Sequence, residues 1–245
     1  LAIISGMYAV YHGPIGVKNI ALRVNHLTRL LASSLSEAGY KLENNSFFDT
    51  IRFKADGWKT KSNQKQMNFR DYNDGSVGIS IDETTREGDI ISILDIFSAE
   101  KSNSLETSIP STLERTSAIL QNPVFHQYRS ETDMLRYMHK LETKDLSLNT
   151  SMIPLGSCTM KLNSTTEMTA VTWPEFSNIH PFAPEYQVKG YQTLIQELND
   201  WLIKITGFDS ISMQPNSGAQ GEYAGLMVIR AYHKAQGNEH RNICL

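Results

Sequence analysis

Gln214-Pro215-Asn216-Ser217-Gly218-Ala219-Gln220-Gly221-Glu222 is the stretch that decides how the second half of this 245-residue chain folds. The short run at 210–214 leads into it and is predicted to be a strand, and a helical pattern follows it. A strand, a turn of small residues and a helix together form a cradle for an anion. The unpaired N–H groups of the first helical turn and the positive end of the helix dipole point the same way.

Ser217 is the natural N-cap of the predicted helix. Glycines at 218, 221 and 225 share one helix face and allow a ligand or another backbone to approach closely. The stretch is neither a Walker A loop, nor a dinucleotide fingerprint, nor a nucleophile elbow. As a bare pattern it predicts either a phosphate site or a capped helix whose small residues serve packing.

Charge and cysteine content exclude several classes of function. The chain has 23 Lys+Arg against 26 Asp+Glu, for a net charge of -3, which does not favour nucleic acid or an anionic membrane surface as a partner. No apolar run approaches the ~18 residues of a membrane span. Two cysteines are too few for a disulfide framework, and no Cys/His spacing matches a zinc site, so we expect a reducing compartment and no metal.

Both ends of the sequence predict a fragment. The first residue is Leu1 rather than Met. Residues 1–10 have the composition of a packed element rather than of a targeting peptide. Residues 241–245 begin an apolar strand and stop.

The first part of the chain is predicted to be a small α+β unit. Apolar residues at helical spacing predict a long amphipathic helix over 17–38, which Gly39 ends. Strands are expected at 47–53 and 78–81. Residues 98–111 are rich in Ser, Asn and Lys, and we expect a linker between two units there.

The second part has the order of a parallel α/β sheet. Ser130 is predicted to cap a helix, and residues 145–186 form a long candidate functional loop. A clean apolar stripe at 188–205 predicts a helix with a buried face. The strand at 210–214, a helix to about residue 236 and a last strand at 241–245 would follow.

Beyond these patterns, the chain closely resembles the P-protein of the glycine cleavage system, the pyridoxal-phosphate glycine decarboxylase. The resemblance covers essentially the whole chain and is looser over about 54–111. The stretches that carry it are 7–13 (MYAVYHG), 47–50 (FFDT), 128–132 (YRSET), 151–163 (SMIPLGSCTMKLN) and 214–226.

The resemblance implies an α/β fold of the fold-type-I pyridoxal-phosphate-dependent transferase class, incomplete and preceded by a small α+β domain. Residues 1–105 would be the C-terminal small domain of the non-catalytic first half, and residues 106–245 the beginning of the catalytic second half. The cradle would hold the cofactor phosphate, with Ser217, Gly218 and Ala219 as the donors.

By the same resemblance, the whole enzyme decarboxylates glycine on pyridoxal 5'-phosphate and passes the aminomethyl group to the lipoyl arm of H-protein. It would be a homodimer, mitochondrial in a eukaryote and otherwise cytoplasmic. The family's Schiff-base lysine, the His that stacks on the cofactor ring and the Asp that pairs with its nitrogen all correspond to positions downstream of Leu245. We therefore expect no catalytic residue in this fragment and no activity from it alone.

Four residues are candidates for the substrate region: Ser157, Thr159, His180 and Asn216. Side-chain to backbone bonds within a loop explain the hydroxyl residues equally well, and a loop or core hydrogen bond explains His180. Lys161 precedes the cradle and is interpreted as a solvated or substrate-loop lysine, and Cys158 as a buried thiol.

Two other functions stay open on the sequence. The polypeptide as given can be a non-catalytic structural or interaction fragment. It can also belong to another fold-type-I enzyme that acts on an amino acid.

Overall fold

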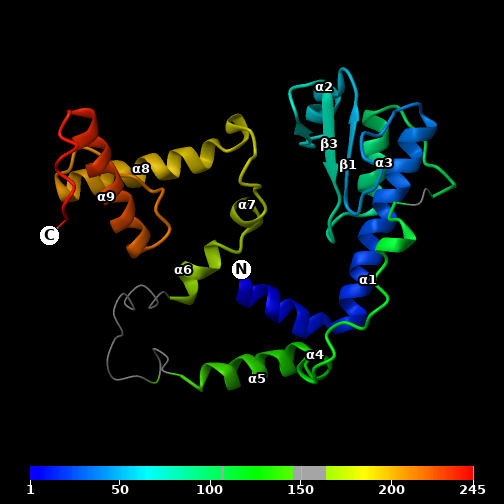
Figure 1. Cartoon of the computed structure of the whole chain (residues 1–245), viewed down its shortest axis with the longest axis horizontal. Coiled ribbons are helices and arrows are strands. Elements are labelled where there is room, and N and C mark those ends of the chain that lie inside the picture. Colours follow the sequence, from blue (N-terminus) through cyan, green and yellow to red (C-terminus); the bar gives the residue numbers. More distant parts are fainter. Residues whose placement is uncertain (106–107, 146–149, 151–163, 245) are drawn as a thin grey trace. The chain divides into compact units, whose positions relative to one another are not determined.

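The computed structural model describes residues 1–105, 108–145, 150 and 164–244 (Figure 1). The chain divides into two compact units, Leu1–Asp145 and Leu146–Leu245.

The first unit is organised by the long helix α1 (Ala2–Glu37). It confirms the helix predicted over 17–38, and Gly39 follows it with a φ of 91°. Leu31 and Leu35 are fully buried on one face of α1, as the four-residue spacing of an amphipathic helix requires. Helical geometry breaks once inside α1, at Gly13, immediately before Pro14.

A small antiparallel sheet lies beside α1. It comprises β1 (Thr50–Lys54), β2 (Arg70–Asp71) and β3 (Ser76–Ser80) in the order β1-β3-β2. The predicted strands overlap with β1 and β3. Ile51 pairs with Ile79, and Phe53 pairs with Val77. All four side chains are buried, because helices pack against the sheet.

Two further helices complete this core: α2 (Trp58–Gln64) and α3 (Glu87–Ile96). Figure 1 shows α3 alongside α1 and the sheet. The ring of Phe53 packs edge-on against Tyr40 and Phe97, at centroid distances of 5.3 and 5.0 Å. Through these aromatic contacts β1 packs against the C-terminal end of α3.

The Ser-rich segment at 98–111, which we predicted to be a linker, is bound to α1. Ser102 is 4% exposed, its N–H donates to Ser34 Oγ (2.9 Å) and its hydroxyl donates to Glu37 (2.6 Å). Ser108 is 3% exposed and bonds the Asn25 side chain. The composition of this segment predicts a loop, but two of its serines are buried and hydrogen-bond to α1.

The domain boundary at 105/106 stays a prediction. No helix or strand crosses the described part of 98–110. The division of the chain into compact units, however, falls between Asp145 and Leu146. Between these places lie η1 (Ser111–Leu113), α4 (Val124–Gln127) and α5 (Glu131–Glu142). Ser130 caps α5 as predicted, because its hydroxyl accepts from the N–H of Asp133 at 3.1 Å.

Helices are the only regular secondary structure in the described residues of the second unit. Its two long helices, α8 (Lys189–Thr206) and α9 (Gly218–Ala235), confirm the predicted ones, and Gly207 ends α8 with a φ of 74°. The described part of the predicted functional loop contains short helices. They are α6 (Thr165–Ala170), α7 (Pro174–Ser177) and η3 (Glu185–Gln187).

Two predictions for this unit are wrong. Residues 210–214 and 241–244 are not strands, and the only sheet in the described residues is the antiparallel one of the first unit. A strand needs a neighbour to accept its ladder of hydrogen bonds, and no described segment of the second unit offers one.

The burial predicted for the α8 stripe is also wrong. Leu194 is 46% exposed, Trp201 59% and Ile205 78%, and no described residue from 164 to 244 is buried. Periodicity correctly predicts the helix and its apolar face, but burial depends on a covering element that these residues do not include.

We expect Phe53→Ala to destabilise the first unit by about 3–5 kcal/mol, because it leaves a cavity beside the rings of Tyr40 and Phe97. The matched control Phe48→Ala removes a side chain that is 43% exposed and should cost far less. Urea denaturation followed by Trp58 fluorescence, with the other two tryptophans changed to Phe, measures both. Equal losses would contradict the assigned core.

The contact between Glu37 and the Ser-rich segment predicts a pH effect. Hydrogen bonds from Ser102 and then Ser104 hold the pKa of the Glu37 carboxyl below its usual value. Because the folded pKa is the lower one, this stabilisation is complete above the unfolded pKa and is lost as pH falls through the folded pKa. Glu37→Gln should flatten this part of the acid unfolding curve. An unchanged acid slope would show that the contact does not form in solution.

Candidate anion-binding site

The start of α9 has the geometry of a capped helix. Ser217 is extended (φ -156°, ψ 169°), and its hydroxyl accepts from the N–H of Gln220 at 3.3 Å. The first bond inside the helix runs from the N–H of Gly221 to the carbonyl of Ser217 at 2.9 Å. Ser217 therefore begins the helix, as the sequence predicts.

The N–H groups of Gly218 and Ala219 precede that first helical bond, so they have no acceptor within the helix. Both residues are exposed, and a Cβ built on Gly218 would meet no described atom within 4 Å. The positive end of the helix dipole acts at the same place. Two donors that have no acceptor within the helix, a hydroxyl and open space suit an anion such as a phosphate group.

Gln220 is a residue of this turn that the sequence analysis missed. Its side-chain oxygen accepts from the N–H of Asn216 at 2.6 Å, while its own N–H bonds Ser217. Gln220 thus stabilises the turn with both its side chain and its backbone. The signal was present, because Ser-x-x-Gln is the spacing of a capping box.

Of the other candidates, the structure describes the local surroundings of His180. His180 lies between α7 and η3, where its Nδ1 accepts from the N–H of Phe182 at 3.0 Å. This local bond matches the loop role that was its alternative explanation. Ser157 and Thr159 lie outside the described residues, as do Cys158 and Lys161.

No group of three or more His, Cys, Asp or Glu side chains among the described residues is arranged to hold a metal ion. None of the helices in the described part of the chain has both the length and the apolar character needed to cross a membrane.

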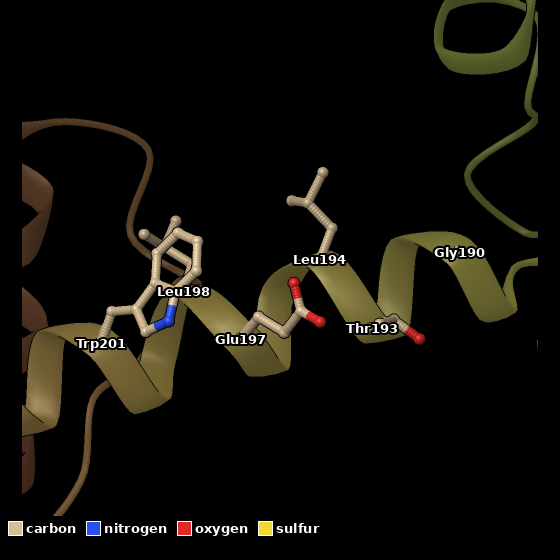
Figure 2. A pocket seen from close by; sticks show the side chains of 6 residues that line it. All are labelled: Gly190, Thr193, Leu194, Glu197, Leu198 and Trp201. Carbon is tan, nitrogen blue, oxygen red and sulfur yellow. The ribbon is translucent and has the colours of Figure 1, made fainter.

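An open groove of about 620 Å³ lies on α8, and none of the predicted site residues lines it. Figure 2 shows its lining side chains along this one helix. The residues are spaced three and four apart, which is the spacing of a single helix face. The groove is thus the uncovered packing face of α8. Its lining is Gly190, Thr193, Leu194, Glu197, Leu198 and Trp201.

The cap geometry predicts the effect of Ser217→Ala. Loss of the hydroxyl should destabilise the first turn of α9 by about 1 kcal/mol. Amide hydrogen exchange at Gln220 and Gly221 measures this change. Ser210→Ala is the matched control, and Ser217→Asn should retain most of the cap. Equal exchange in Ser217→Ala and Ser210→Ala would contradict the cap.

Comparison with known proteins finds relatives that share one name. The family model of the glycine cleavage system P-protein matches residues 1–97. The whole chain is 52% identical to a glycine dehydrogenase (decarboxylating) from Synechocystis sp. and covers 26% of that protein. The values are 51% and 27% for the Nostoc punctiforme protein of the same name, and 49% and 27% for the Klebsiella pneumoniae one.

The match extends along all of this chain, from the helix α1 to the capped start of α9. The chain spans about a quarter of the length of these relatives. About half of its residues are identical to theirs along its whole length, so the chain is similar to these glycine dehydrogenases (decarboxylating) and, over residues 1–97, to the glycine cleavage system P-protein.

Proposed function

We propose that these residues are part of a pyridoxal-phosphate-dependent glycine decarboxylase that passes the aminomethyl group of glycine to the lipoyl arm of H-protein. The observation that carries the proposal is the identity of about half, along the whole chain, to relatives named glycine dehydrogenase (decarboxylating). Pyridoxal phosphate, when bound, supplies the electron sink for departure of CO2.

The part of the site contributed by this chain is the holder of the cofactor phosphate. The Ser217 hydroxyl and the N–H groups of Gly218 and Ala219, which have no acceptor within α9, are the donors. The helix dipole alone contributes only about 0.3–2 kcal/mol, so the three donors must act together. Their chemistry fits a dianionic phosphate, since all three can donate and the space before Gly218 is open.

At the substrate end we propose Asn216, His180, Ser157 and Thr159. Asn216 adjoins the cap, its backbone N–H donates to the Gln220 side chain, and its side-chain amide would serve a ligand. The His180 ring, with Nδ1 engaged as an acceptor, would present an Nε2–H donor.

For the whole protein we propose the fold-type-I transferase fold, with 1–105 ending its first half and 106–245 beginning its catalytic half. The uncovered apolar face of α8 supports this proposal, because helices that cover a parallel sheet bury such a face. We also propose a homodimer. A mitochondrial location in a eukaryote stays a prediction, since the relatives compared above are bacterial.

The lysine that carries the cofactor and the Asp that pairs with its ring nitrogen are proposed to lie in the polypeptide after Leu245. The cradle fixes only the phosphate end of the cofactor and leaves its electronics unchanged. The residues of this chain therefore bind and orient, and do not by themselves perform the chemistry.

The test is exchange of labelled CO2 into the carboxyl of glycine by the full-length protein with lipoylated H-protein. We expect exchange that depends on H-protein. Ser217→Ala in that protein should weaken retention of pyridoxal phosphate, roughly tenfold for one charge-assisted hydrogen bond, while Ser210→Ala should not. Absence of exchange would refute the function, and unchanged retention would refute the cradle alone.

The second candidate is that the polypeptide as given has a non-catalytic, structural or interaction role. The closed core of the first unit favours it, because that unit has its own buried interior. We expect the 245-residue chain to release no CO2 from glycine. Incubation with pyridoxal phosphate, borohydride reduction and peptide mapping should label surface lysines sparsely. Stoichiometric labelling of one lysine with CO2 release would contradict this expectation.

A further inference from the structure

Two distant sequence motifs, 7–13 and 128–132, meet at the break in α1. Arg129 Nη1 donates to the carbonyl oxygen of Val10 at 3.0 Å and to that of Tyr11 at 2.9 Å. Its Nη2 donates to the carbonyl oxygen of Phe125. The first two bonds span 119 and 118 residues of sequence and lie within the first compact unit.

The carbonyl groups at this break need an external donor. In an uninterrupted helix the carbonyl of Val10 would accept from the N–H of residue 14, but Pro14 has none. Val10 is only 4% exposed, so water is a poor substitute. A buried carbonyl without a donor costs about 1–3 kcal/mol, and a guanidinium also suits the negative end of a helix segment.

Gly13 makes room for this arrangement. Its backbone has φ 58° and ψ -173°, a conformation that residues with a side chain rarely adopt. A Cβ at Gly13 would also overlap the guanidinium of Arg129. Gly13 therefore permits both the turn of the chain and the approach of the arginine.

We propose that Arg129 is a latch: it ends the first helical segment of α1 and, through the same bonds, holds the α4–α5 segment against that helix. Arg129 directly precedes Ser130, the N-cap of α5, so the latch fixes where α5 begins. It joins two stretches that the sequence assigns to different halves of the protein. The proposal is independent of the cofactor and of the proposed reaction.

Amide hydrogen exchange of the 245-residue chain tests the latch. Arg129→Met keeps an apolar stem and removes every donor. We expect it to speed exchange at residues 5–12 and 124–135 by about ten- to a hundredfold, the effect of losing hydrogen bonds from a charged donor. Exchange in β1 and β3 should not change. Arg115→Met is the matched control, because Arg115 bonds the side chain of Ser117, two residues away.

A rescue variant separates the latch from a general packing role. Gly13→Ala with Pro14→Ala supplies the missing N–H and allows a continuous helix, so Val10 no longer needs Arg129. In that background Arg129→Met should change exchange by less than about threefold at residues 5–12. Equal effects in both backgrounds would overturn the proposal. If the doubly substituted chain does not fold, the comparison with Arg115→Met decides, and equal exchange in those two variants would refute the latch.

Discussion

The leucine face of α1 is the surface on which the first unit depends. Leu27, Leu31 and Leu35 share one buried core with β1, β3 and α3, and each contributes about 1.5–3 kcal/mol by leaving water. Other parts of the unit form hydrogen bonds with the same helix. The Ser-rich segment bonds Ser34 and Glu37, and Arg129 bonds the carbonyls at the break. One helix thus orders residues that lie more than a hundred positions apart.

The second unit has the opposite character. Its helices form where periodicity and caps predict them, yet their apolar faces are exposed and the expected strands are absent from its described residues. One physical cause explains both departures, because a helix face and a strand edge each need a partner segment. The relatives are about four times as long as this chain, and we propose that their remaining polypeptide supplies the sheet.

Local signals made part of this fold and site predictable. The 3.6-residue period revealed α1 and α8, and the cap residues Ser130 and Ser217 marked where α5 and α9 begin. Features that depend on distant residues were not predictable. Composition suggested a linker at 98–111, but its serines find partners on α1, and nothing in either motif shows that Arg129 meets Val10. Whether His180 approaches the cradle likewise depends on the tertiary arrangement.

The central claim is that the first unit has a complete core and that the second needs polypeptide beyond these residues. Residue-resolved amide hydrogen exchange of the 245-residue chain tests it most directly. The account predicts slow exchange in the second segment of α1, in β1, β3 and α3, governed by global unfolding. It predicts fast exchange throughout α8 and α9, because their faces are uncovered. Protection of α8 and α9 equal to that of β1 would contradict it.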